Sequence, residues 1–255
     1  MPDGQGRVGS YVESISTSSS TVNDHLSVSV GITIGYPFLN AGVEVDYDRS
    51  VLENKNGTRM SRTASCRVGR VIINDTPKFS RKAIQLLNRH DGGARFRAEY
   101  GDYYVYGYEI GANAGASLCA DSSSKDVEQT IKIRVKAKVL FFEVVSPDVV
   151  IHSHDSTSSA SMIFTGYSTM DIVSKNLVYP QTGPHDEVFI QQTAAEYQKK
   201  MNNLHADVMG KLKEFKLVNG ALVSPAVCAN LCKEGMAIQL LLAPFVRLSQ
   251  YIANV

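Results

Sequence analysis

The residues best suited to chemistry lie in the segment "IHSHD", where His152 and His154 flank Ser153 and Asp155 follows directly. Imidazole nitrogens and a carboxylate oxygen are ligands that zinc accepts, and alternate residues of a strand share one face. A zinc site needs further ligands, however, and an H-x-H pair also arises by chance in a polar loop. Both readings stay open here; we favour the polar loop and predict neither a metal site nor a cofactor.

Two of the four cysteines are also spaced for a shared role. Cys228 and Cys232 lie in "CANLC", so they share a face if this segment is helical. No further ligands with comparable spacing lie nearby, as a zinc site would need. We therefore predict buried, reduced thiols.

No motif specifies an enzymatic reaction. The chain has no G-x-x-x-x-G-K-[ST] phosphate-binding loop and no G-x-S-x-G elbow for a hydrolase. An enzyme would have to use dispersed side chains, namely the tyrosines with Asp102, Glu109, His152 or His154. We predict no catalytic residue, although an enzyme that reuses its fold remains an alternative.

Charge and hydropathy exclude some classes of protein. The 255 residues include 26 basic and 25 acidic residues, so the basic excess typical of non-specific nucleic-acid binding is missing and we predict no nucleic-acid partner. No run of 18 apolar residues predicts a transmembrane helix. The first residues, "MPDGQGRVGS", lack the apolar core of a signal peptide. We expect a cytoplasmic protein, or one released by an unconventional route.

The pattern of elements predicts an α+β fold. Residues 1–24 are rich in Ser and Gly and are expected to be partly disordered, and residues 25–255 are expected to form a single domain. Alternation of period two predicts strands, and spacing of three to four predicts helices. The predicted strands cover 26–35, 41–51, 61–73, 96–116, 131–145 and 162–168. The predicted helices cover 75–91, ended by Gly92 and Gly93, and a C-terminal helical part from about 186 to 255.

Two of these strands are amphipathic. In each of them, the apolar residues share one face. These residues are Val28, Val30, Ile32 and Ile34 in the strand over 26–35, and Ile131, Ile133, Val135 and Val139 in the strand over 131–145. The second strand alternates with Lys132, Arg134, Lys136 and Lys138. Such a strand is typical of the solvated edge of a sandwich, and also of a transmembrane β-strand that turns its polar face to a water-filled lumen. The pattern alone leaves both readings open.

The stretch "YGDYYVYGYEIGA" resembles the signature of the membrane-attack-complex/perforin (MACPF) superfamily. This signature is Y-G-[T/S]-H-[F/Y], then six intervening residues, then G-G. Tyr100, Gly101 and Tyr104 match the first part, and Gly111 matches the first glycine of the pair. Asp102, Tyr103 and Ala112 depart from the pattern. This form is closest to MACPF-like proteins of filamentous fungi, and the wider resemblance covers roughly residues 25 to 215.

The resemblance implies a bent and twisted, four-stranded antiparallel central sheet flanked by helices, as in the MACPF and cholesterol-dependent-cytolysin fold. Segments near 27–50 and 118–161 would refold into membrane hairpins, with Lys132, Arg134, Lys136 and Lys138 lining the lumen of an oligomeric, anion-preferring pore. The implied bending points in or beside the signature strand are Gly101, Gly107, Gly111 and Gly115.

The resemblance also implies partners: a lipid membrane or a membrane-bound partner protein, with further copies of the chain when active. The alternative is a non-lytic binding or structural module on the same fold.

Overall fold

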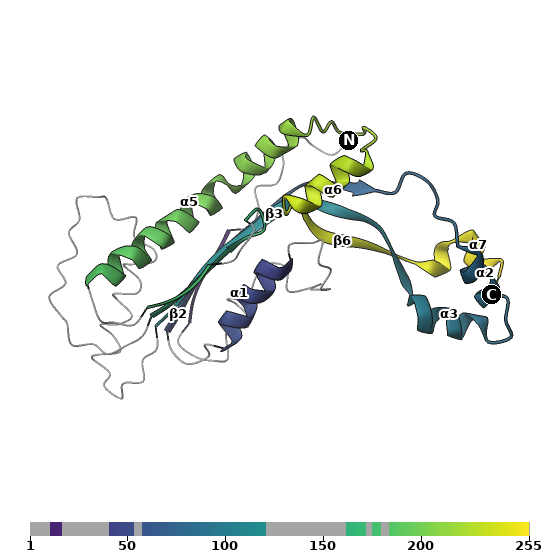
Figure 1. Cartoon of the computed structure of the whole chain (residues 1–255), viewed down its shortest axis with the longest axis horizontal. Helices are drawn as coiled ribbons and strands as arrows, with labels where there is room; N and C mark the ends of the chain where they lie inside the picture. Colours follow the sequence, from purple (N-terminus) through teal and green to yellow (C-terminus); the bar gives the residue numbers. More distant parts are fainter. Residues whose placement is uncertain are drawn as a thin grey trace. The chain divides into compact units, whose positions relative to one another are not determined.

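The computed structural model describes residues 11–16, 41–53, 58–120, 162–171, 175–179 and 184–254. Their strands form one sheet in the order β1-β2-β3-β4-β5, with β6 also paired to β3 (Figure 1). The strands are β1 (Tyr11–Ser16), β2 (Thr58–Ile72), β3 (Tyr103–Ala120), β4 (Met162–Ser168), β5 (Lys175–Tyr179) and β6 (Ala237–Pro244). The helices are α1 (Ala41–Glu53), α2 (Arg81–Leu87), α3 (Gly92–Tyr100), α5 (Pro184–Glu214), α6 (Pro225–Lys233), the 3-10 helix η2 (Phe245–Arg247) and α7 (Ser249–Ile252). The α+β class is confirmed.

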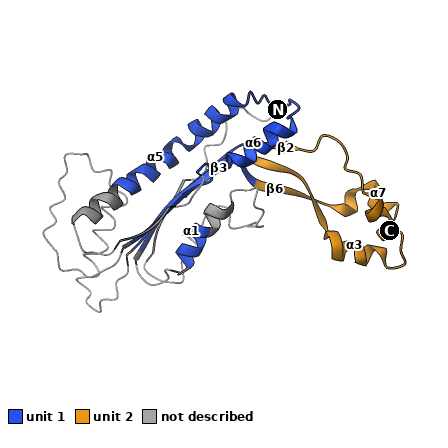
Figure 2. Cartoon of the chain, viewed as in Figure 1, with its two compact units in different colours: residues 1–68, 111–238 blue, residues 69–110, 239–255 orange. Residues whose placement is uncertain are grey.

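The chain divides into two compact units (Figure 2). The larger unit comprises residues 1–68 and 111–238, and the smaller unit comprises residues 69–110 and 239–255. Strands β2, β3 and β6 each contribute residues to both units. Each unit has buried apolar side chains of its own, which are described in turn.

In the larger unit, α1 and α5 lie on opposite faces of the sheet (Figure 1). The register fixes these faces, because the antiparallel pairs β1–β2, β3–β4 and β4–β5 are in continuous alignment. Alternate residues of β4 then point to alternate helices, since successive side chains of a strand point to opposite faces. Phe164 lies on the α5 side, and Thr165 lies on the α1 side.

The smaller unit is built around the ring of Phe96, which is buried with Ala83 and Leu87. Four rings have their centroids 4.9 to 5.5 Å from it, those of Phe79, Tyr100, Phe245 and Tyr251. Two polar contacts close the C-terminal segment over this cluster. The backbone N–H of Phe245 donates to the Asp102 carbonyl at 3.0 Å, and that of Phe79 donates to Gln250 Oε1 at 2.8 Å.

Two predictions about helices are wrong. Residues 41–51, predicted as a strand, lie in helix α1, because Tyr47, Ser50 and Val51 are spaced three and four apart and share a buried face. Gly92 and Gly93, predicted to end a helix, instead begin α3. Helix α2 has already ended at Leu87, and a side chain at Gly92 would overlap the Leu87 carbonyl group.

Three predictions about strands are also wrong. The strand predicted from residue 96 begins at Tyr103, because Phe96 and Tyr100 belong to α3 and both pack into the aromatic cluster. Residues 237–244, predicted to be helical, form β6 and pair with β3. The sheet has six described strands where four were expected, and β1, β5 and β6 lie where no strand was predicted. Strands over 61–73 and 162–168 and a helix from about 186 are confirmed by β2, β4 and α5.

A substitution at Gly101 can test the backbone geometry of the smaller unit. It caps α3 at φ 76° and ψ −164°, a region that residues with a side chain avoid. We expect Gly101→Ala to lower the free energy of unfolding by about 1–3 kcal/mol, measured by urea denaturation. Gly69→Ala is the matched control, because Gly69 has no positive φ and no atom lies within 4 Å of the place its Cβ would take. Equal effects from the two substitutions would contradict the proposed strain.

Candidate functional site: a sheet held between two helices

Helix α1 is clamped to β3 and β4 by hydroxyl groups and an aromatic pair. Ser50 Oγ and Thr165 Oγ1 share a hydrogen bond of 2.8 Å, and both side chains are buried. The ring of Tyr47 lies 4.7 Å from that of Tyr167, centroid to centroid, and Val51 completes this cluster. Along α1, Tyr47, Ser50 and Val51 follow helical spacing, so these three residues share one face of the helix.

Tyr47 is also joined to β3 through a hydrogen bond with the Ser117 side chain. Burial raises the pKa of Tyr47 far above its ordinary value, and the nearby Asp48 carboxylate raises it further, against smaller opposing effects of Ser117 and Arg59. The phenol therefore keeps its proton at any physiological pH. It can hold this hydrogen bond without placing a charge inside the sheet.

On both faces of the sheet, a tyrosine ring occupies the space above a glycine. A Cβ at Gly115 would come within 2.5 Å of the Tyr167 ring, which sits on the directly paired position of β4. On the opposite face, a Cβ at Gly166 would lie 2.7 Å from the ring of Tyr197 of α5. The missing side chains let the rings approach the backbone, and both tyrosines are buried as a result.

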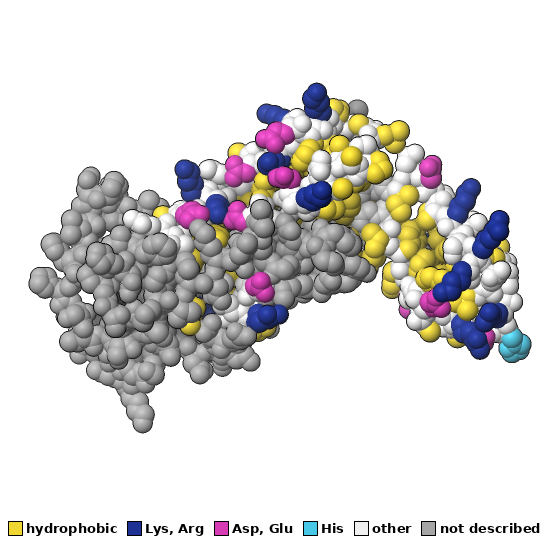
Figure 3. Space-filling model, viewed as in Figure 1, with side chains coloured by type: hydrophobic (Ala, Val, Ile, Leu, Met, Phe, Trp, Pro, Cys, Tyr) yellow, Lys and Arg dark blue, Asp and Glu magenta, His cyan; other side chains and the backbone are white. Residues whose placement is uncertain are grey.

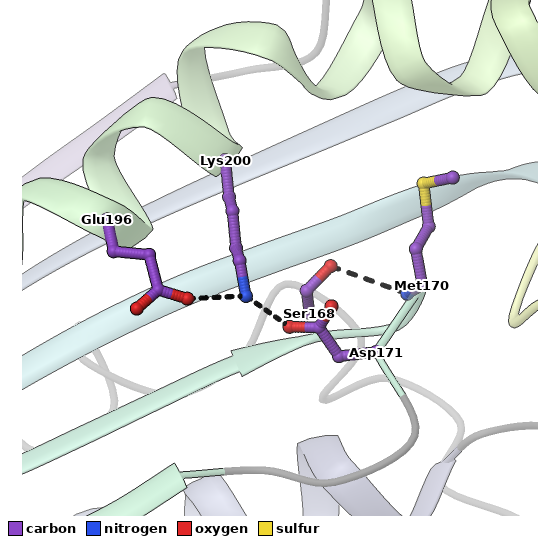
Figure 4. Close-up of polar contacts among 5 residues, drawn as sticks. All are labelled: Ser168, Met170, Asp171, Glu196 and Lys200. Carbon is purple, nitrogen blue, oxygen red and sulfur yellow. Dashed lines mark hydrogen bonds and ion pairs between the residues drawn. The ribbon is translucent and has the colours of Figure 1, made fainter. Parts of the chain in front are cut away.

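Helix α5 is held to the end of β4 by Lys200 (Figure 4). Lys200 Nζ lies 2.7 Å from Asp171 Oδ2, 3.1 Å from Glu196 Oε1, and 4.8 Å from the centre of the Tyr197 ring. Burial acts to lower the pKa of Lys200, but the hydrogen bonds to Asp171 and Glu196 outweigh it and raise that pKa. The ammonium group thus stays charged and fixes α5 over the sheet.

A buried amide links three neighbouring segments of the sheet. Arg67 Nη1 of β2 donates to Asn113 Oδ1 of β3 at 2.6 Å. Thr169 follows β4. Its Oγ1 accepts a hydrogen bond from the backbone N–H of Asn113 at 3.0 Å, and its backbone N–H donates to the Asn113 carbonyl at 2.9 Å. These bonds fix the alignment of β2, β3 and the turn after β4.

The structure separates the residues of the predicted signature. Tyr100 and Tyr104 pack in the aromatic cluster of the smaller unit, and Asp102 forms an ion pair with Arg97 at 2.6 Å. Gly107 and Gly111 both lie on β3, where a side chain would overlap the carbonyl oxygens of Val71 and Cys66 on β2. The signature glycines are thus positions of close strand contact, and Gly101 caps a helix.

Other predicted residues lie outside the described part of the chain. They are the membrane-hairpin candidates Val28, Val30, Ile32, Ile34, Ile131, Ile133, Val135 and Val139, the lumen candidates Lys132, Arg134, Lys136 and Lys138, and the metal candidates His152, His154 and Asp155. Among the residues that are described, no group of His, Cys, Asp or Glu is arranged to hold a metal ion. None of the described helices is both long and apolar enough to cross a membrane.

Sequence reasoning missed the residues that hold the helices, chiefly Tyr47, Ser50, Thr165, Gly166 and Tyr197. One signal was available, because Tyr47, Ser50 and Val51 have helical spacing. A second was the glycine inside the predicted strand "MIFTGYS", since such a glycine marks a close approach of another group.

Comparison with known proteins gives weak structural matches only. No family model and no curated protein matches the chain. GNIP1Aa from Chromobacterium piscinae matches with a TM-score of 0.28 at 14% identity, over 78% of this chain and 48% of that one. Pneumolysin matches with a TM-score of 0.26 at 11% identity, over 76% of this chain and 38% of that one. Listeriolysin O matches with a TM-score of 0.22 at 12% identity, over 74% of this chain and 36% of that one. The chain spans less than half of each, and TM-scores below 0.5 do not establish a shared fold.

Gly166 is the position where the fit of α5 on the sheet can be tested. We expect Gly166→Ala to lower the free energy of unfolding by about 1–3 kcal/mol, because its Cβ must displace the buried Tyr197 ring. The measurement is urea denaturation followed by circular dichroism. Gly210→Ala on α5 is the control; no atom lies near its Cβ, and we expect it to be neutral or stabilising by up to about 1 kcal/mol. A neutral Gly166→Ala would show that the ring contact is unimportant.

Proposed function

We propose that this chain perforates membranes as an oligomer, by refolding residues near 27–50 and 118–161 into β-hairpins that enter the bilayer. The sequence signature at Tyr100–Ala112 supports the proposal, because it resembles that of the MACPF superfamily. The likeness to fungal members rests on that sequence stretch alone. The observation that carries the proposal is how the strands are connected.

Two long connections join neighbouring strands. Residues 17–57 link β1 to β2, and residues 121–161 link β3 to β4; both pairs are antiparallel, and the two connections are equal in length. A transmembrane β-strand takes about 9–11 residues. Each connection is therefore long enough to supply two such strands and a turn, as a direct extension of the pair that it joins.

Both connections also leave the sheet at the same end. Gly111 of β3 lies beside Cys66 of β2, and Gly115 lies beside Arg62, so residue numbers rise along β3 as they fall along β2. The end of β3 at Ala120 is thus next to the start of β2 at Thr58. Two extended hairpins would be neighbours and could join one barrel wall, as an oligomeric β-barrel requires.

This function requires α1 to leave the sheet, because α1 lies within the first connection. Its contacts with Ser117, Thr165 and Tyr167 would be lost when residues 27–50 become hairpin strands. Holding α1 in place should therefore stop perforation without stopping membrane binding.

A disulfide lock tests this step. Ser50→Cys combined with Thr165→Cys places two thiols where hydroxyl oxygens lie 2.8 Å apart, a separation suited to a disulfide. We expect the oxidised double variant to release no dye from vesicles, and reduction with dithiothreitol to restore release. The two single variants are the controls, since neither can form this bridge. Dye release that is unaffected by oxidation would contradict the hairpin role of residues 27–50.

Ion selectivity tests the second hairpin. Lys132, Arg134, Lys136 and Lys138 of every subunit would face the lumen, so we expect channels in planar bilayers to prefer anions. Replacing all four by Glu should shift the reversal potential in a salt gradient toward cation preference. Cation preference in the unmodified protein would contradict the assignment of the lumen face.

The second candidate function is a non-lytic binding or structural module, which the buried contacts of α1 favour. The two functions differ in how easily α1 opens. Amide hydrogens of α1 that exchange only by global unfolding, with or without vesicles, would favour the static module.

A further inference from the structure

The loop between α5 and α6 displays apolar side chains on the surface of the larger unit. Leu222 is 84% exposed and Val218 is 70% exposed, and Ala221, Pro225 and Ala226 are also exposed. Figure 3 shows hydrophobic side chains gathered over α6 and the adjoining end of α5. We call residues 216–226 the apolar loop. Contiguous apolar patches rimmed by polar residues mark interaction sites on protein surfaces.

Defined turns hold this loop in shape. Just after α5, Lys216 adopts a φ of 53°. Its N–H donates to the Lys213 carbonyl, and the N–H of Leu217 donates to the Leu212 carbonyl. These two bonds form a Schellman motif. The N–H of Ala221 then donates to the Val218 carbonyl across a turn that contains Gly220 at φ 78°.

The start of α6 completes the loop. The Ser224 hydroxyl accepts from the Val227 N–H at 3.3 Å and caps this helix, and Pro225 is its first residue. The exposed Val218 and Leu222 are therefore presented by a preformed turn. Because the turn is already ordered, binding a partner costs little conformational entropy.

The charge around the apolar loop is positive. Residues 215–233 contain no Asp or Glu, and the flanking Glu214 and Glu234 both face Lys211, at 3.3 and 3.1 Å. Lys213, Lys216 and Lys233 are exposed and form no ion pair with another residue in the described ranges. Residues 211–234 thus carry four lysines against two carboxylates, and both carboxylates are paired with Lys211.

We propose that the apolar loop docks the chain on membranes that contain anionic lipid, with Val218 and Leu222 below the headgroups and the lysines among the phosphates. Exposed aliphatic groups with an excess of lysine complement such a layer. A protein partner fits less well, because protein interfaces favour aromatic residues and Arg over Lys, and a projecting turn needs a matching pocket. This inference rests on the proposed function at a membrane, but concerns a docking step distinct from hairpin insertion.

A single fluorophore can report the docking directly, because the chain contains no Trp. The full-length Leu222→Trp variant is mixed with vesicles of phosphatidylcholine with or without phosphatidylserine. We expect the Trp emission to shift to shorter wavelength and to be quenched by brominated acyl chains, only when phosphatidylserine is present. Ile252→Trp is the matched control, since Ile252 is 68% exposed in the smaller unit and should not shift.

Binding measurements on the same vesicles test the side chains. Val218→Ser with Leu222→Ser should weaken vesicle partition about 10- to 100-fold, and Lys216→Gln with Lys233→Gln about 10-fold. Ile252→Ser should leave partition unchanged. All substituted positions are exposed, so circular dichroism should show unaltered folding.

Three results would overturn the proposal: unchanged Trp emission with vesicles, equal partition of the Val218→Ser/Leu222→Ser variant, or an emission shift without vesicles that grows with protein concentration. The last would identify a second copy of the chain as the occupant. Dye release recorded in the same samples separates the two proposals. Docking without dye release supports docking by the apolar loop and counts against perforation. Dye release with unchanged Trp emission contradicts docking by the apolar loop and is consistent with perforation.

Discussion

The larger unit depends on tyrosine rings that lie directly against glycines of the sheet. Tyr167 covers Gly115 on the face that α1 occupies, and Tyr197 of α5 covers Gly166 on the other face. A single added carbon at either glycine would enter a ring, so the distance between helix and sheet is set by the absence of side chains. The remaining contacts of both helices, including Ser50 with Thr165 and Lys200 with Asp171, follow from this spacing.

The two helices are attached by different kinds of contact. On the α5 side, Lys200 binds two carboxylates and also lies against Tyr197, so charge and packing act together. On the α1 side, the direct contacts named above are between neutral hydroxyl groups and rings, although the buried Arg59 and the nearby Asp48 act on Tyr47 electrostatically. Salt screens exposed charges but acts much less on partly buried pairs, and the Lys200 and Asp171 side chains are only 30% and 33% exposed. The geometry therefore makes α5 a fixed brace and gives α1 an attachment that depends mainly on packing.

The sequence predicted the elements whose pattern is decided locally. Strands β2 and β4 have clear alternation, and α5 has long-range helical spacing, so all three were found. The prediction failed at β6, where "AIQLLLAP" is apolar except for Gln239 and fits a helix or a strand, and pairing with β3 decides the outcome. It failed at α1 because Val43, Val45 and Tyr47 alternate by accident, while burial of Tyr47 against Tyr167 selects the helix. The clamp itself joins residues over a hundred positions apart, a contact that no local pattern contains.

The strength of the α1 clamp bears on whether a helix can be stored on the sheet and later released. Burial of Tyr47 and Val51 contributes about 4 kcal/mol, and the two hydroxyl hydrogen bonds add about 1 kcal/mol each. The conformational entropy lost on ordering α1 opposes these terms, so about 6 kcal/mol is an upper bound on the free energy of detachment. Such a clamp keeps α1 docked in solution, where detachment would expose two apolar side chains. Under the proposed function, it would be offset by burying several apolar side chains of a hairpin in lipid, at roughly 1.5–3 kcal/mol each. On that proposal, the same contacts would hold α1 on the sheet before membrane contact and would be given up at the bilayer.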